Sequence, residues 1–121
     1  MRYLLLFLAL AAPARAQDIE AGQRAFAVCR GCHQVGPNAK HAIGPALNGL
    51  LGRKAGTYPD YKYSDANRTS ELIWDAPTLE AYLAKPAAMM PGSKMVFAGV
   101  TDPQKVKDII AYLSQYGEKT P

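Results

Sequence analysis

The chain has few of the residues from which metal centres are usually built. Only two cysteines and two histidines occur among its 121 residues. Both cysteines and one histidine fall in a single pentapeptide, Cys29-Arg30-Gly31-Cys32-His33. A structural zinc site takes four ligands, and outside the pentapeptide the chain adds only His41 and no further cysteine. A zinc site would have to use all four of these residues, which disfavours it.

Dense runs of positive charge and strand-like alternation are also missing. The net charge is only +4, and no stripe of lysine and arginine is interleaved with aromatic residues. Nucleic-acid binding is therefore not indicated. Little of the chain alternates with the period of two that marks a strand. A thioredoxin-like pair of cysteines normally lies in a βαβ context, so this interpretation is disfavoured as well.

A long apolar run is absent, and the single short one lies at the N-terminus. Residues 3–12 are too few to cross a bilayer, which takes about 20 residues. They follow the positive charge of Arg2 and precede Ala14-Arg15-Ala16, a small-residue cleavage pattern. We predict a cleaved signal peptide over residues 1–16, a single domain over 17–121, and export to the periplasm. Loss of Arg2 and Arg15 lowers the net charge from +4 to +2.

The pentapeptide itself has the C-x-x-C-H pattern of c-type haem attachment. Its two thiols can each add to one vinyl group of a porphyrin, because residues three apart lie on one face of a helical turn. His33 would then be carried under the iron as an axial ligand. In bacteria this attachment takes place outside the cytoplasmic membrane, which agrees with the predicted export.

Capping residues and apolar residues three or four apart predict an all-α chain. The predicted elements are a helix from Asp18 to near Gly31, a short turn over 64–70, a helix opened by Asp75 and stopped by Pro86, and a last helix opened by Asp102. Gly22, inside the first helix, indicates the close approach of another backbone. The irregular segments 34–56 and 86–99 are long for a small domain, which is typical of loops that wrap something functional.

A six-coordinate haem iron needs a second axial ligand, and the chain offers several candidates. His41 follows His33 so closely that reaching the opposite haem face would be awkward. Met89 and Met90 lie just after a proline and can simply pack. Met95 lies in the turn-rich segment 91–99, which can hold a thioether against a metal. The local context therefore favours Met95.

Together these pieces resemble the class I cytochromes c, in particular the mitochondrial-like bacterial type. The resemblance covers about residues 19–116. It is carried by residues 29–33, 44–54, 63–67, 74, 82–83, 91–99 and 110–113. It implies the all-α cytochrome c fold, in which N- and C-terminal helices cross and short middle helices and long loops surround one covalently attached haem c.

The resemblance also implies roles for individual residues. Covalent attachment falls to Cys29 and Cys32, and axial ligation of the iron to His33 and Met95. The carbonyl of Pro45 would accept a hydrogen bond from the His33 ring. The buried propionate would lie beside Arg53, Tyr63 and Trp74. A hydrogen-bond network near the sulfur would comprise Asn67, Tyr82 and Ser93. Phe97 would shield the haem edge, and His41 would connect loops.

The implied function is one-electron transfer, without enzymatic activity, by a monomer that does not insert stably in a membrane. The expected partners are a membrane-bound donor such as a bc1-type complex, and an acceptor such as a terminal oxidase, a reaction centre or a reductase. Two alternatives are a tightly bound subunit of a periplasmic oxidoreductase, and a peroxidatic or ligand-binding haem protein if Met95 does not bind iron.

One departure from mitochondrial members concerns the docking lysines. Val28, Ala42 and the pair Ala87-Ala88 stand where lysines are expected, although Lys94 remains. The lysine ring that steers mitochondrial partners is therefore thinned, which makes the oxidoreductase-subunit alternative more credible.

Overall fold

The computed structural model describes residue 8 and residues 18–117, so the predicted cleavage site lies outside the described residues. The elements are α1 (Ile19–Ala25), the 3₁₀ helix η1 (Phe26–Val28), α2 (Asp65–Thr69), α3 (Ala76–Ala84), α4 (Pro86–Met89) and α5 (Pro103–Ser114). Within the described ranges the only β-pairing is one isolated bridge between Lys54 and Ile73. The all-α prediction is confirmed. None of the described helices is long and apolar enough to cross a membrane.

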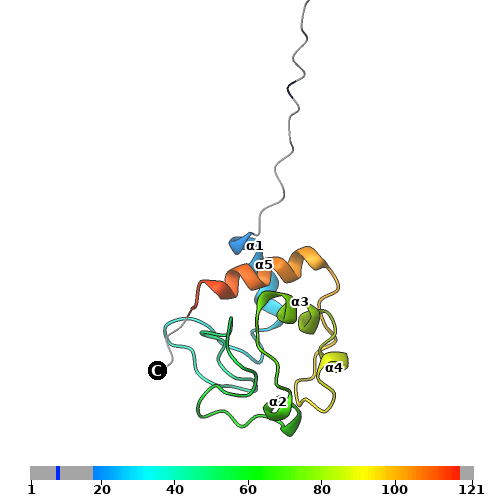
Figure 1. Ribbon diagram of the computed structural model, residues 1–121. Helices are drawn as coiled ribbons and strands as arrows, with labels where there is room; N and C mark the ends of the chain where they lie inside the picture. The colour runs from blue at the N-terminus through cyan, green and yellow to red at the C-terminus, as the bar shows by residue number, and fades with distance from the viewer. Residues whose placement is uncertain (1–7, 9–17, 118–121) are drawn as a thin grey trace, which may run out of the picture.

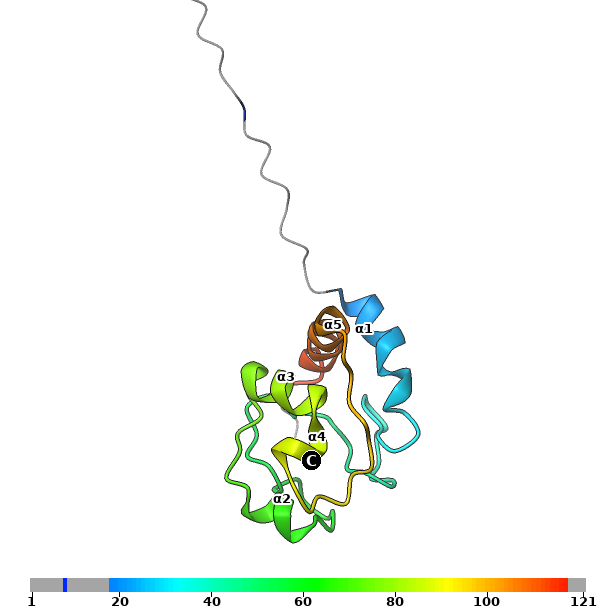
Figure 2. The same cartoon turned by 90° about the vertical axis from the view of Figure 1, so that its right-hand side faces the viewer.

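Helices α1 and α5 cross at the top of the described part of the molecule, and the long loops lie below this pair (Figures 1 and 2). Gly22 makes the crossing possible, because a Cβ at this position would lie 1.9 Å from the backbone oxygen of Asp108. Beside it, the rings of Phe26 and Tyr112 pack with centroids 5.4 Å apart. The close backbone approach expected from an interior glycine is thus confirmed.

Acidic caps begin three of the helices where the sequence predicts them. The carboxylates of Asp18, Asp75 and Asp102 each accept a hydrogen bond from a backbone N–H two or three residues later. A carboxylate there satisfies a donor that the helix leaves unpaired and meets the positive end of the helix dipole. Local sequence therefore fixes where α1, α3 and α5 begin.

Two element boundaries differ from prediction. The first α-helix ends at Ala25 rather than near Gly31, and the chain continues as η1 into a turn. The segment 86–99, predicted as a loop, begins with the short helix α4. Pro86 does end α3, but it also occupies the first turn of α4, where its missing N–H and fixed φ are tolerated.

Two long segments form opposite sides of the lower part of the molecule in Figure 1. The cyan-to-green loop over residues 34–64 lies on one side, and α4 with the yellow segment that follows it lies on the other. The core connects them at the top through the buried side chains of α3 and α5, among them Leu79, Leu83 and Ile109. This arrangement places two loop walls on either side of an interior space.

Candidate haem site

A cavity of about 280 Å³ lies beneath the helix crossing, between the two loop walls. Apolar side chains from α3, α5 and both loops line most of it. The cavity also brings together all the residues that the family resemblance places around the haem: Cys29, Cys32, His33, Pro45, Arg53, Tyr63, Asn67, Trp74, Tyr82, Ser93, Met95 and Phe97.

The two cysteines lie in the turn that follows η1. The N–H of Cys32 and that of His33 both donate to the Cys29 carbonyl, at 3.1 and 2.9 Å, so the motif forms one helical turn. Both thiols are free. Burial raises the pKa of the Cys29 thiol to about 11, which the Arg30 charge only partly opposes. Since the thiolate is the nucleophile, burial of this kind disfavours the reactive form of the thiol.

The His33 ring is oriented by its neighbours on the loop 44–45. Its Nδ1 lies 2.8 Å from the Pro45 carbonyl, and a carbonyl can only accept, so the proton resides on Nδ1 and Nε2 keeps its lone pair. Burial lowers the pKa of His33, although the bond to Pro45 acts in the opposite direction. Neutral imidazole with one nitrogen free is the form that binds metals.

Gly44 also contacts this ring, and sequence reasoning missed it. A Cβ on Gly44 would lie 2.3 Å from the Cε1 atom of His33, closer than real Cβ atoms approach. The sequence placed Gly44 only in a loop, and the contact of Gly44 with a ring eleven residues earlier has no local signal. Gly44 therefore belongs to the site through packing.

Met95 is held at its side chain and at its backbone. The Tyr82 hydroxyl donates to its sulfur at 3.1 Å, and its own backbone N–H donates to the Ser93 Oγ at 3.3 Å. Tyr82 is buried. Burial raises the pKa of the Tyr82 hydroxyl, and a hydrogen bond with Ser93 partly offsets this. At neutral pH the hydroxyl therefore keeps the proton that it donates to the sulfur.

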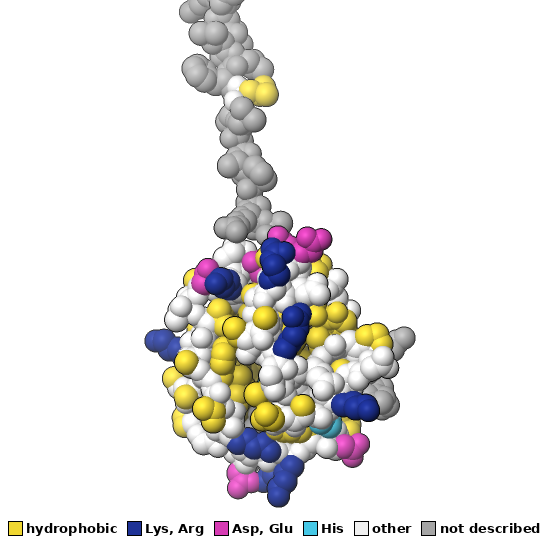
Figure 3. All heavy atoms as spheres, turned by 180° about the vertical axis from the view of Figure 1, so that it is seen from behind, with side chains coloured by type: hydrophobic (Ala, Val, Ile, Leu, Met, Phe, Trp, Pro, Cys, Tyr) yellow, Lys and Arg dark blue, Asp and Glu magenta, His cyan; other side chains and the backbone are white. Residues whose placement is uncertain are grey.

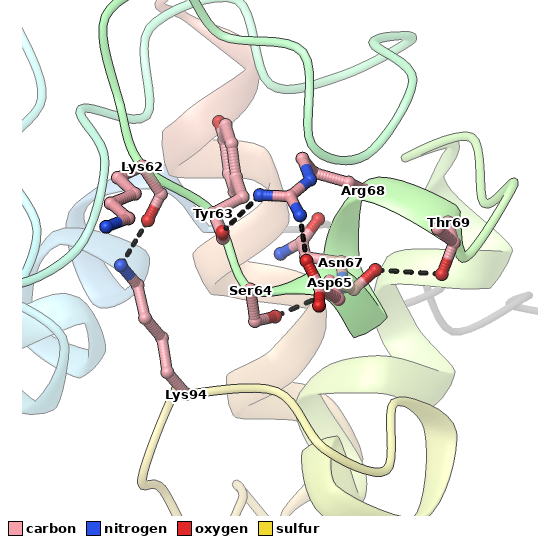
Figure 4. A network of polar contacts seen from close by, with 8 residues as sticks. All are labelled: Lys62, Tyr63, Ser64, Asp65, Asn67, Arg68, Thr69 and Lys94. Carbon is pink, nitrogen blue, oxygen red and sulfur yellow. Dashed lines mark hydrogen bonds and ion pairs between the residues drawn. The ribbon is translucent and has the colours of Figure 1, made fainter.

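Asn67 presents a buried polar atom that lacks a partner. Its Oδ1 is fully buried and makes no hydrogen bond with the part of the chain that the structure describes. The residue sits in α2, whose first turn is fixed by the bond from the Asn67 N–H to the Ser64 Oγ at 3.1 Å (Figure 4). A buried carbonyl without a partner costs about 1–3 kcal/mol. The amide is therefore placed to interact with something inside the cavity.

Arg53 and Tyr63 provide the polar part of one cavity wall. The Arg53 guanidinium donates to the Asn48 carbonyl at 2.6 Å and lies 4.2 Å from the Tyr58 ring centroid. Burial lowers the pKa of Arg53 and raises that of Tyr63. Trp74 is buried and lies beside Arg53, because its backbone N–H donates to the Arg53 carbonyl at 2.9 Å. A cation and a hydroxyl in an apolar surrounding suit an anionic group such as a carboxylate.

The competing ligand candidates lie elsewhere. His41 uses both ring nitrogens, because Nδ1 accepts from the Ala46 N–H at 3.0 Å and Nε2 donates to the Pro59 carbonyl at 2.7 Å. Met90 is buried in the core and Met89 packs against it. Across residues 18–117, no three side chains of histidine, cysteine, aspartate or glutamate gather as a metal site would require.

The opening of the cavity has an apolar rim. Val28, Ile43 and Val96 line the cavity, and their exposed fractions are 63%, 76% and 99%. These are large values for aliphatic side chains, which usually lie inside. Seen from behind, the molecule exposes apolar side chains across the middle of one face, with separate lysine and arginine side chains around them (Figure 3).

Comparisons with known proteins agree with this site. Residues 19–116 match the family described as Cytochrome c. The cytochrome c2 of Blastochloris viridis is 48% identical over 113 residues, 93% of this chain and 89% of that protein. The structure of cytochrome cH from Methylobacterium extorquens is 47% identical and superposes with a TM-score of 0.77, over 81% of this chain and 98% of that one. Cytochrome c2 from Rhodospirillum Centenum, 36% identical, gives a TM-score of 0.79 over 84% and 99% of the two chains. The chain therefore belongs to the cytochrome c family, the electron carriers that hold one covalently attached haem.

Proposed function

We propose that this cytochrome c is a monomeric one-electron shuttle of the periplasm, with an iron held by His33 and Met95. Its donor would be a membrane-bound complex of the bc1 type, and its acceptor a terminal oxidase, a reaction centre or a reductase. When bound, the haem supplies reversible one-electron exchange between ferrous and ferric iron. The residues around it supply attachment, ligation and a closed environment.

The side chains of the cavity fit this group. The free thiols of Cys29 and Cys32, one turn apart, would hold it covalently. Asn67 also lines the cavity, and its buried Oδ1 has no hydrogen-bond partner among the described residues, so it can take a polar partner from a bound group. Arg53 and Tyr63 are placed to receive a carboxylate. The apolar remainder suits a flat macrocycle.

One observation carries the proposal: two ligands of the right kind line the same cavity, each already oriented by a hydrogen bond. Pro45 fixes the His33 tautomer that leaves Nε2 free, and Tyr82 donates to the Met95 sulfur. Ligation by both residues would fill both axial positions and leave no place for a substrate on the iron. This supports electron transfer rather than catalysis.

The surroundings of the ligands favour the reduced state. A thioether is a soft, neutral ligand that favours ferrous iron, and the Tyr82 hydroxyl draws electron density from the sulfur. Burial acts in the same direction, because the oxidised centre carries one more positive charge. We therefore expect a carrier of relatively high reduction potential. The residues around its iron should move little between the ferrous and the ferric state.

The cavity opening suggests how partners are met. Its apolar rim is suited to brief contacts through a small interface. Charged residues around such a rim increase the association rate more than the affinity. With a predicted net charge of only +2 after cleavage, we expect moderate dependence of the association rate on ionic strength.

The assignment of Met95 can be tested by optical spectroscopy of the ferric holoprotein at neutral pH. We expect the weak red absorption band of an iron–methionine bond in the wild type, and its loss in Met95→Ala. Met89→Ala is the matched control, because Met89 packs against the core and should keep the band. A wild type without the band would contradict the shuttle and favour the peroxidatic alternative.

The same holoprotein distinguishes a free shuttle from a subunit of an oxidoreductase. Gel filtration of a native periplasmic extract should place the haem absorbance at the mass of a monomer. Elution as a stable larger complex would overturn the proposal of a free carrier in favour of the subunit.

A further inference from the structure

Tyr61 joins three segments of the molecule that are distant in the sequence. Its hydroxyl donates to the Ile43 carbonyl at 2.6 Å. The Lys94 ammonium lies 4.7 Å from the centroid of its ring. The ring also packs edge-on against Tyr63, with centroids 4.8 Å apart, and in a tilted arrangement against His41, with centroids 5.5 Å apart. One half-buried side chain thus touches the loop after the haem motif, its own loop and the segment that bears Met95.

Lys94 makes a second contact with the same loop. Its Nζ donates to the Lys62 carbonyl, so the chain of Lys94 reaches across from the Met95 segment (Figure 4). A lysine over an aromatic face with its ammonium on a carbonyl is held by two attractions at once. The residue immediately before Met95 is therefore connected to the loop on the far side of the cavity.

Side-chain contacts of this kind matter because the Met95 segment has little backbone support. Backbone hydrogen bonds hold Ser93 to Met90 and Val100 to Leu83. Between these anchors, residues 94–99 make no backbone–backbone hydrogen bond with any described residue. A segment with few backbone bonds opens locally at low free energy unless side chains restrain it.

We propose that Tyr61 is a positioning residue that keeps the Met95 segment closed over the haem. Its ring holds Lys94, and its hydroxyl anchors the ring to Ile43, so the pair restrains the segment that carries the axial sulfur. This inference rests on the proposed ligation by Met95. Tyr61 also lines the cavity, and the role inferred for it is to hold that segment.

The test measures the affinity of the ferric holoprotein for imidazole, which binds the iron only when the methionine leaves. Tyr61→Leu removes both the ring and the hydroxyl bond, and it should raise this affinity about tenfold. Tyr61→Phe keeps the ring beneath Lys94 and loses only the bond to Ile43, so the increase should be about threefold. Global stability is measured in parallel by guanidinium denaturation.

Two further variants separate positioning from a general loss of stability. Tyr116→Leu removes a ring that packs on Tyr112, away from the Met95 segment, and should lower stability without changing imidazole affinity. Lys94→Gln should raise the affinity in the wild type but have a smaller effect in Tyr61→Leu, because the two residues act as a pair.

The measurements distinguish a positioning role of Tyr61 from a purely structural one. If Tyr61→Leu lowers global stability as Tyr116→Leu does while imidazole affinity stays at the wild-type value, Tyr61 is only a folding residue and the inference is wrong. If Tyr61→Leu does not load haem, Tyr61→Phe and the single variant Lys94→Gln decide by the same criterion: an imidazole affinity unchanged in both would overturn the inference. The wild-type red band is the separate check on Met95 ligation: its absence overturns the proposed function, whereas a normal band with unchanged affinities overturns Tyr61 alone.

Discussion

The two proposed axial ligands are held in contrasting ways. His33 lies in a helical turn closed by backbone bonds, its ring bonded to the Pro45 carbonyl and packed against Gly44. Met95 lies in the segment 94–99, which makes no backbone–backbone hydrogen bond with any described residue, and the side chains of Tyr82 and Ser93 hold it. The histidine side is thus fixed by the backbone, and the methionine side by side chains.

This difference says which side can change without loss of the fold. The backbone contacts of His33 involve the attachment turn itself, so disturbing them disturbs the whole site. The contacts of Met95 can be removed one at a time by substitutions that keep the shape of the side chain. We therefore expect large losses of stability on the histidine side, and changes of potential or pH dependence on the methionine side.

The largest expected effect is that of Gly44→Ala. The added methyl would lie 2.3 Å from the Cε1 atom of His33, so the ring must move and its bond to Pro45 must lengthen. Overpacking together with the lost hydrogen bond should lower the free energy of unfolding by about 2–4 kcal/mol, measured by guanidinium denaturation of the holoprotein.

Gly31→Ala is the matched control for this substitution. A Cβ at Gly31 meets nothing within 4 Å, although the residue lies in the same haem motif. Its stability should stay within about 0.5 kcal/mol of the wild type. If both variants were equally stable, the His33 ring would be free to shift, and the contrast between the two sides would not hold.

The sequence predicted much of this arrangement where the signal is local. The C-x-x-C-H motif, the aspartate caps and the apolar spacing of α5 concern neighbouring residues, and the structure agrees with them. The close approach at Gly22 was also predicted, because a glycine inside a helix needs a reason.

What the sequence could not provide depends on contacts between distant residues. Gly44 against His33 and Tyr61 beneath Lys94 arise only when loops far apart in the chain come together. Helix α4 was missed for a different reason: Pro86 was interpreted as a stop, yet the same residue begins a new helix. The roles of the cavity residues came from the family resemblance, and their position around one cavity from the structure.

On the methionine side, Tyr82→Phe removes one hydroxyl and keeps the ring. Without the hydrogen bond from Tyr82, the Met95 sulfur donates more electron density and the ferric state is favoured. The reduction potential should fall by about 20–40 mV, since about 59 mV corresponds to a tenfold change for one electron. Redox titration measures this shift. Tyr116→Phe is the control: Tyr116 does not line the cavity, so this substitution should leave the potential unchanged. A potential unaltered in Tyr82→Phe would show that the hydroxyl does not act on the ligand.

The smallest expected effect is a difference in stability at alkaline pH, again on the methionine side. Burial raises the pKa of Tyr82 above its usual value of 10.0. The unfolded chain therefore releases this proton at a lower pH than the folded chain does. The contribution of the Tyr82 proton to folding stability is fully present below about pH 10 and is lost as the pH rises through the folded pKa, with a slope of at most about 1.4 kcal/mol per pH unit.

Denaturation of wild type and Tyr82→Phe in parallel isolates the contribution of Tyr82, because all other titrating groups are common to both. As the pH rises from about 10 towards the folded pKa of Tyr82, the wild type should lose more stability than the variant. If the stability of the two proteins changed with pH in the same way, the Tyr82 hydroxyl would reach solvent in the folded holoprotein. The methionine side would then be more open than its side-chain contacts indicate.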